Sequence, residues 1–132
     1  MTPQNTKSSN RKRSENRYLF HWPVAIVFDS IEGQGTYHGR TNDVSLTGCS
    51  ILTEHNVFST QAVTVLLSLP SDHAGERRPV IEVKAAMVYT VLAAGAQKFR
   101  CGIHFLDFKG NGLAALDKVI NERAVKVELG GF

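Results

Sequence analysis

The feature that most constrains the fold is a series of six short apolar segments, rich in β-branched and aromatic residues and closely spaced along the chain. Between residues 99 and 105, apolar side chains alternate with arginine, glycine and histidine, a period typical of a strand with one buried face. Pro23 lacks an amide donor, so we expect an edge or a bulge where it occurs. The predicted strands are Leu19–Phe28, Thr36 towards Arg40, Cys49–Thr53, Val63–Leu69, Val80–Val91 and Phe99–Phe105.

A single helical pattern follows these strands. Leu113, Leu116 and Ile120 recur at helical spacing with Val119 beside them, and they predict a short amphipathic helix that ends near Arg123. Because strands and helices do not alternate, a Rossmann-type sheet is excluded. The pattern predicts an all-β fold with one helix, in which the helix covers an open edge or the mouth of an antiparallel barrel. A chain of 132 residues is sufficient for one hydrophobic core.

Basic residues are concentrated at the N-terminus. Residues 1–17 contain five basic residues and one acidic residue, whereas the other 115 contain ten and eleven, so the body is close to neutral. Proteins that bind duplex nucleic acid usually spread basic groups over a face, and a concentrated cluster instead suits a small anion or an acidic partner. Residues 1–12 are polar and aperiodic, so we expect a flexible basic leader there and a folded domain over residues 13–132.

The start of the chain has no apolar segment typical of a secretory signal, and no run reaches the length of a membrane span. We therefore expect a cytoplasmic protein that does not insert into membranes. In that compartment Cys49 and Cys101, both within apolar runs, are expected to be reduced core residues. The five histidines show no spacing typical of metal ligands, so no metal is expected.

Two short motifs combine groups that suit a guanine nucleotide. Arg13 and Arg17 form an Arg-x-x-x-Arg motif before the first predicted strand, and residues 43–48 form an Asp-x-Ser-x-x-Gly motif between the second and third. A guanidinium can bind phosphate or the O6 and N7 atoms of guanine. Asp43 can accept the N1–H and N2–H donors of guanine, and Ser45 can donate or accept. Gly48 lets the backbone come close to a ligand or permits a positive φ.

Each motif alone is weak. Two arginines in a basic leader usually form a solvated surface, and Asp, Ser and Gly are common turn residues. A match to the second motif somewhere in such a chain has a chance of roughly 5%. Their combination in this order is more specific. A hydrolytic triad of Ser45, Asp43 and His38 or His55 is disfavoured, because no nucleophile elbow or oxyanion signal accompanies them.

The two motifs, in this order and at this separation, resemble those of the PilZ domain family. Arg13–Arg17 followed by Tyr-Leu-Phe-His-Trp-Pro-Val is similar to the entry into that family's first strand, and Cys101-Gly-Ile-His-Phe105 to a late strand. The resemblance implies a six-stranded split barrel with a C-terminal helix, which binds cyclic di-GMP on its outer surface while the arginine arm folds over the ligand. It implies Arg13, Arg17, Asp43, Ser45 and Gly48 as ligand-binding residues. It also implies that Lys12 influences whether one ligand or a stacked pair binds.

The resulting hypothesis is a non-enzymatic bacterial receptor for cyclic di-GMP, without another cofactor, that signals to an unidentified effector protein in trans. It would act as a monomer or a ligand-linked dimer, in a pathway such as motility or biofilm regulation. One alternative is a PilZ-like interaction module of pilus or flagellar machinery that does not bind the nucleotide, although the intact arginine pair disfavours it. Another is a barrel that binds single-stranded nucleic acid through the leader. Because the body is near neutral, we expect no DNA or RNA partner.

Overall fold

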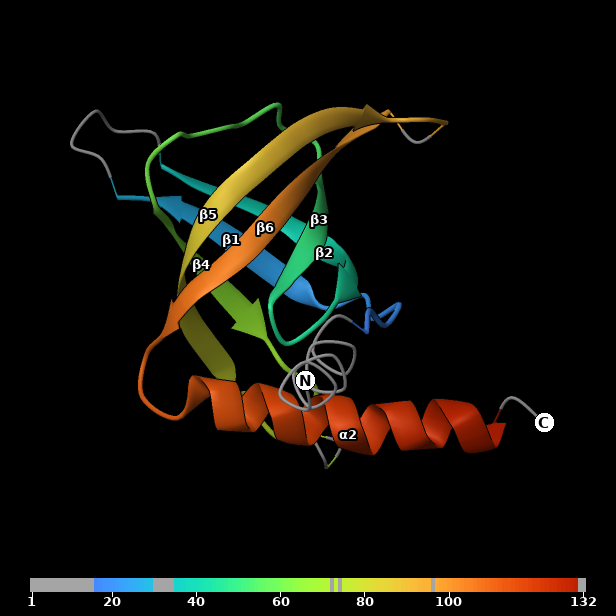
Figure 1. Cartoon of the computed structure of the whole chain (residues 1–132). Coiled ribbons are helices and arrows are strands. Elements are labelled where there is room, and N and C mark those ends of the chain that lie inside the picture. The colour runs from blue at the N-terminus through green and yellow to red at the C-terminus, as the bar shows by residue number, and fades with distance from the viewer. Residues whose placement is uncertain (1–15, 30–34, 72, 74, 96, 131–132) are drawn as a thin grey trace, which may run out of the picture.

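The structure, a computed structural model, describes residues 16–29, 35–71, 73, 75–95 and 97–130, with side chains described up to residue 124. It confirms the predicted six-stranded antiparallel barrel with one helix at its C-terminal end (Figure 1). The expected leader over residues 1–12, which includes Lys12, lies outside the described residues, and so does Arg13. The elements are β1 (Pro23–Phe28), β2 (Thr36–Val44), β3 (Gly48–Thr53), β4 (Val63–Ser68), β5 (Val80–Ala93), β6 (Lys98–Phe108) and α2 (Gly112–Gly130).

The barrel is closed in the order β1-β2-β3-β6-β5-β4. Strand β1 pairs with β2 on one side and with β4 on the other, so no strand among the described residues is left as an open edge. The sequence predicts that the helix covers either an open edge or the mouth of the barrel. In the structure it covers the mouth, since α2 runs across one end of the barrel (Figure 1). Leu116 and Ile120 enter the core from that end and close it.

The first strand begins at Pro23 and not at Leu19, which corrects the predicted boundary. Residues 18–22 instead cross β2 through irregular contacts at Thr41. The Thr41 hydroxyl donates to the carbonyl of Phe20 and accepts from the amide of Trp22 at 2.8 Å, while the Thr41 amide donates to the Trp22 carbonyl at 2.9 Å. Pro23 is neither at a sheet edge nor at a bulge. As the first residue of its strand, it has no preceding ladder bond to interrupt.

The second strand is longer than predicted, because β2 continues from Arg40 to Val44 and includes the first two residues of the Asp-x-Ser-x-x-Gly motif. The pairing with β3 shifts between Thr41 and Asp43, which identifies a bulge. An extra residue in a strand reverses the faces that its side chains occupy, so the alternation in the sequence is lost at that point. The remaining four strands agree with their predicted limits to within three residues.

Apolar side chains of all six strands and of α2 form one core. Cys49 and Cys101 are buried, free thiols within it, as predicted. Trp22 is buried in this core and stacks on Phe20, which packs against the core, with ring centroids 4.8 Å apart. The helix extends past Arg123, where the sequence pattern weakens, and Leu113 is 46% exposed although its spacing predicts a core position. No helix among the described residues has the length and apolar content needed to cross a membrane.

Candidate functional site

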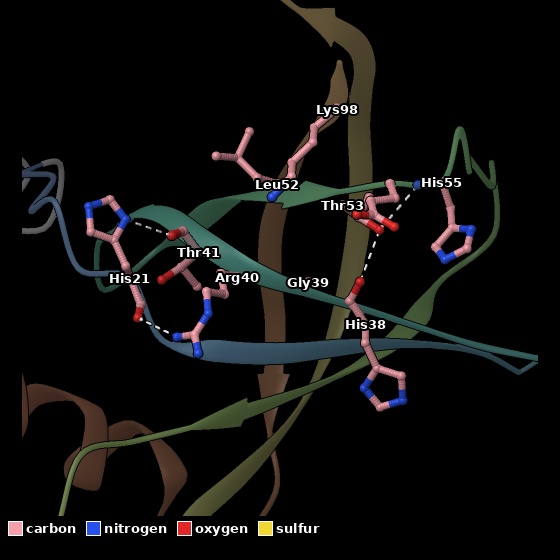
Figure 2. A pocket seen from close by; sticks show the side chains of 10 residues that line it. His21, His38, Gly39, Arg40, Thr41, Leu52, Thr53, His55 and Lys98 are labelled. Atoms are coloured by element: carbon pink, nitrogen blue, oxygen red, sulfur yellow. Dashed lines mark hydrogen bonds between the residues drawn. The ribbon is translucent and has the colours of Figure 1, made fainter. Parts of the chain in front are cut away.

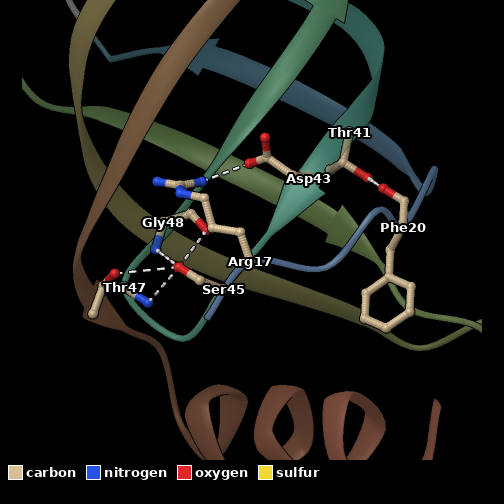
Figure 3. A network of polar contacts seen from close by, with 7 residues as sticks. All are labelled: Arg17, Phe20, Thr41, Asp43, Ser45, Thr47 and Gly48. Carbon is tan, nitrogen blue, oxygen red and sulfur yellow. Dashed lines mark hydrogen bonds and ion pairs between the residues drawn. The ribbon is translucent and has the colours of Figure 1, made fainter. Parts of the chain in front are cut away.

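Arg17 and Asp43, one residue of each sequence motif, meet at the end of β2. Arg17 Nη1 lies 2.5 Å from Asp43 Oδ1, and Figure 3 shows the guanidinium of Arg17 directed towards this carboxylate. The next residue, Tyr18, forms an isolated bridge with Val44, since each amide donates to the other's carbonyl at 2.9 Å. Arg17 therefore lies on the barrel wall, held by its own side chain and by the backbone bridge that follows it.

The pair is accessible from solvent, with side-chain exposures of 48% for Arg17 and 21% for Asp43. At such exposure, water screens much of the attraction between the charges, so the pair contributes little to stability. A ligand that forms hydrogen bonds with both side chains can therefore replace the Arg17–Asp43 contact at a small cost in free energy. The geometry thus presents a guanidinium donor and a carboxylate acceptor together, at one point on the outside of the barrel.

Ser45 lies in the turn between β2 and β3, with its hydroxyl directed inward. It is fully buried, and Ser45 Oγ accepts from the amides of Thr47 and Gly48 at 3.2 Å and lies 3.2 Å from the Gly48 carbonyl (Figure 3). The Ser45 amide donates to the same carbonyl at 2.8 Å. These contacts satisfy the hydroxyl within the turn, which holds the position of Asp43 two residues earlier. The hydroxyl is not accessible to a ligand in this structure.

Gly48 has no positive φ. A Cβ added at this glycine would lie 2.1 Å from the backbone oxygen of Ile103, which is on the neighbouring strand β6. The glycine is therefore required because β3 and β6 approach closely at their first paired residues, Gly48 and His104. Of the two roles that the sequence suggests for Gly48, a positive φ is wrong. Close approach of the backbone to a ligand stays a prediction, and the close approach that the structure shows is to strand β6.

A hollow of about 250 Å³ lies beside the Arg17–Asp43 pair, over the outer faces of β3, β5 and β6. Its lining includes both members of the pair together with Ser50, Tyr89 and His104. Tyr89 lies against Gly102, its partner across the β5–β6 ladder, where an added Cβ would be 2.2 Å from the ring. The tyrosine is 39% exposed, and its ring forms a flat wall of the hollow. Sequence reasoning missed Tyr89, although Gly102 belongs to the late-strand motif.

The floor of the hollow contains Ser50, another residue that the sequence did not single out. Ser50 pairs with Asp43 across the β2–β3 ladder, and it is 3% exposed. Its hydroxyl has no hydrogen-bond partner among the residues that the structure describes. A buried hydroxyl is usually hydrogen-bonded, so this one has unused capacity directly beneath the ion pair. The hollow therefore offers a cation, an anion, an aromatic face and a hydroxyl.

The neighbouring thiol is not suited to chemistry. Burial raises the pKa of Cys49 to about 12, and the negative charge of Asp43 adds to this increase, against the opposing effect of Arg17. The pKa of Cys101 is also raised, chiefly by burial. Both thiols therefore stay protonated near neutral pH, and a thiol in that form is a poor nucleophile and metal ligand. The hydroxyl of Ser45 contacts only Thr47 and Gly48 among the described side chains and turn atoms, so no histidine there activates it.

Comparison with known proteins identifies a family. The model of the PilZ domain matches residues 11–122, which is most of the chain and includes both motifs. No curated protein matches the chain in sequence.

Solved structures share the fold at low sequence identity. The inhibitor of motility MotI of Bacillus subtilis has a TM-score of 0.64 at 16% identity, over 83% of this chain and 50% of that one. PlzA of Borreliella burgdorferi, in complex with c-di-GMP, has a TM-score of 0.53 at 12% identity, over 99% and 58%. The PilZ domain of YcgR from Escherichia coli, with c-di-GMP, has a TM-score of 0.52 at 12% identity, over 83% and 88%. The chain thus spans about half the length of MotI and PlzA.

Proposed function

The chain belongs to the PilZ domain family, and we propose that it is a receptor for cyclic di-GMP that uses the Arg17–Asp43 pair to recognise a guanine. The observation that carries this proposal is the convergence of the two motifs, 26 residues apart in sequence, at one exposed point beside a hollow. The solved structures of PlzA and of the YcgR domain, which share the fold, contain c-di-GMP.

The groups at this point have complementary chemistry for guanine. The planar guanidinium of Arg17 can donate to O6 and N7 or to a phosphate, while Asp43 accepts from N1–H and N2–H. Tyr89 offers a face on which a base can stack, since stacking on an aromatic side chain is favourable for any base. Arg13 would provide a second guanidinium for the other half of the ligand. Lys12, beside it, would add positive charge near the phosphates.

Within this proposal Ser45 and Gly48 do not contact the ligand. They stabilise the turn and the strand that position Asp43. Ser45 caps the turn that holds Asp43, and Gly48 allows β3 to lie against β6. Contact between the Ser45 hydroxyl and a guanine edge, which the sequence suggests, would require the turn to open and its four hydrogen-bonding contacts to Thr47 and Gly48 to be lost. We therefore assign Ser45 and Gly48 as positioning residues and Asp43 as the direct contact.

The proposed activity is binding and signalling rather than catalysis. We propose that the output passes to an effector protein in trans. MotI, whose structure shares this fold, is an inhibitor of motility, which supports motility as the pathway to examine first.

Isothermal titration calorimetry with cyclic di-GMP tests the proposal. Replacement of Arg17 or Asp43 with alanine removes a charge-assisted contact and should weaken binding by about ten- to a hundredfold. Asp43→Ala should also reduce the preference for cyclic di-GMP over cyclic di-AMP, because adenine lacks the two donors that Asp43 accepts. Arg77→Ala is the matched control, since Arg77 is exposed and lies outside the hollow.

The controls separate the alternatives. GTP and a short oligonucleotide should bind much more weakly than cyclic di-GMP. A wild-type protein that gives no heat with cyclic di-GMP would favour the interaction module that does not bind nucleotide. Wild-type affinity in the Arg17→Ala/Asp43→Ala double variant would mean that the nucleotide binds elsewhere.

A further inference from the structure

A second and larger hollow lies over the outer faces of β2 and β3, with a volume of about 510 Å³ (Figure 2). It shares no lining residue with the hollow beside Arg17 and Asp43. Figure 2 shows His21 and His55 at opposite ends of it, with Arg40 between them. Neither of the two sequence motifs contributes to its lining, so the proposed nucleotide site does not account for it.

The lining of this hollow is predominantly basic. Arg40 and Lys98 supply two positive charges against the single carboxylate of Glu54, and three imidazoles add hydrogen-bonding capacity. Neither Arg40 nor Lys98 forms an ion pair with any carboxylate in the described part of the chain. Arg40 is oriented by a hydrogen bond of 3.2 Å from its Nη1 to the carbonyl of His21. The body of the protein is close to neutral, so this local excess of cations is not a general property of its surface.

An apolar hollow of about 350 Å³ adjoins the basic one. The two share His38, Gly39 and Arg40, so they form one continuous surface around the barrel. The lining of the second includes Leu66 and Val80, and Val80 is 59% exposed. A surface with cations at one end and exposed apolar side chains at the other is complementary to a segment that carries carboxylates next to apolar residues.

We propose that this continuous surface, formed around Arg40, is the docking site for an acidic segment of the effector protein, with apolar side chains of that segment over Val80. Single-stranded nucleic acid is the less suitable occupant, because it binds largely by stacking on aromatic rings, and the two hollows offer only the small imidazole rings of His21, His38 and His55 and no Phe, Tyr or Trp. This inference deepens the proposed receptor function by assigning a surface to its partner, but the docking itself does not require the nucleotide.

The segment from Arg17 to Trp22 connects this surface with the proposed nucleotide site. At one end Arg17 pairs with Asp43, and at the other His21 Nδ1 lies 3.1 Å from the carbonyl of Thr41 while the His21 carbonyl accepts from Arg40. Movement of Arg17 from Asp43 to a bound nucleotide would thus be transmitted along the segment to His21 and Arg40. Occupancy of one site should therefore change affinity at the other, and linkage requires the effect to be reciprocal.

Fluorescence anisotropy with a short labelled peptide of glutamate and leucine tests the docking site in the full-length protein. Arg40→Glu and Lys98→Glu should each weaken binding of this peptide by about three- to tenfold, because each replaces an attraction with a repulsion. Glu54→Gln should strengthen binding, because it removes the carboxylate that opposes the ligand. Arg77→Glu makes the same charge change at an exposed position outside both hollows and should have a smaller effect.

Two further measurements make the result decisive. Lys98→Glu should retain the thermal unfolding midpoint and the cyclic di-GMP affinity of the wild type, because Lys98 forms no hydrogen bond or ion pair with the segment from Arg17 to Trp22 in the described part of the chain. A protein that binds the peptide but not cyclic di-GMP would therefore overturn the proposed receptor function and not the docking site. Equal peptide affinity for Arg40→Glu and Arg77→Glu would overturn the docking proposal. It would also be overturned if oligothymidine, but not the peptide, bound in a manner that depends on Arg40.

Discussion

Gly48 belongs to the Asp-x-Ser-x-x-Gly motif, but in the structure it allows two strands of the barrel to pack closely together. Its Cα faces the backbone of Ile103, and a methyl group there would lie 2.1 Å from the carbonyl oxygen. Backbone on a paired strand cannot yield as a flexible side chain would, so the strands must separate locally. We predict that Gly48→Ala destabilises the protein by about 1–3 kcal/mol or more, measured by urea unfolding.

The control for this substitution is Gly35→Ala. A Cβ at Gly35 meets no atom within 4 Å, and its only cost comes from the φ of +80°. That cost is about 1 kcal/mol or somewhat more. If Gly48 instead served approach of the ligand, Gly48→Ala would lower nucleotide affinity without loss of stability, and the assignment of Gly48 to strand packing would be wrong.

Cys49 predicts a dependence of stability on pH. Its pKa is raised from the ordinary 9.0 to about 12 by burial, so between these values the folded protein retains a proton that the unfolded chain has lost. The contribution of the Cys49 thiol to the free energy of unfolding is therefore fully present below about pH 9, and it declines as the pH rises towards 12. Relative to Cys49→Ala, the wild type should lose about 2 kcal/mol of unfolding free energy between about pH 8 and about pH 10.5. Parallel stability curves for the two proteins would contradict this prediction.

Individual residues are predictable from sequence when their role depends on residue type, and less so when it depends on a neighbour distant in sequence. The Arg17–Asp43 contact joins charges that the motifs single out. Tyr89 is missed because its position over Gly102 arises from the β5–β6 register, which period-two alternation does not give. Ser50 is missed for a similar reason, because only pairing with Asp43 places it beneath the ion pair.

At the scale of elements, strands are predictable where one face is clearly apolar. The full length of β2 is not, because its outward residues are polar and the bulge between Thr41 and Asp43 interrupts the alternation. The segment before β1 resembles a strand in sequence because Tyr18, Phe20 and Trp22 have strong strand preference. In the structure the Thr41 hydroxyl forms hydrogen bonds with the carbonyl of Phe20 and the amide of Trp22, so these two backbone groups are not available for a strand ladder.

Helix α2 offers a direct comparison of two leucines three residues apart. Leu116 is fully buried in the end of the barrel, whereas Leu113 is 46% exposed. Because truncation of a buried leucine leaves a cavity, Leu116→Ala should cost about 2–5 kcal/mol of unfolding free energy. Leu113→Ala should cost less than about 1 kcal/mol. Equal losses in urea unfolding would mean that the helix does not insert Leu116 into the end of the barrel.

At the scale of the whole molecule, closure of the barrel limits how a signal can travel. All six strands are paired on both sides, so a strand cannot shift without breaking a ladder on each side. The residues from Arg17 to Trp22 lie outside this ladder and are held by a few contacts to β2. This segment is therefore a part of the described chain that can move in response to a nucleotide while the strand ladders stay intact.

This arrangement divides the N-terminal arm into two parts with different expected behaviour. In the free protein the amides of Tyr18 and Val44 donate to each other's carbonyls, so both should already be protected from hydrogen exchange. In the proposed function Arg13 binds the same ligand as Arg17 and Asp43, so we predict that residues 12–16 gain protection only when cyclic di-GMP binds. The ordering of each residue costs about 1–2 kcal/mol, which limits the ordered stretch to what the ligand contacts can offset.

Hydrogen exchange measured by mass spectrometry or NMR, with and without saturating cyclic di-GMP, checks this prediction. Arg77→Ala should show the same gain at residues 12–16 as the wild type, whereas Arg17→Ala should lose it together with affinity. Protection of residues 12–16 in the free protein, or none at saturation, would exclude the arm as the switch. In that case the signal would have to leave by another route, such as direct contact between the bound nucleotide and the effector.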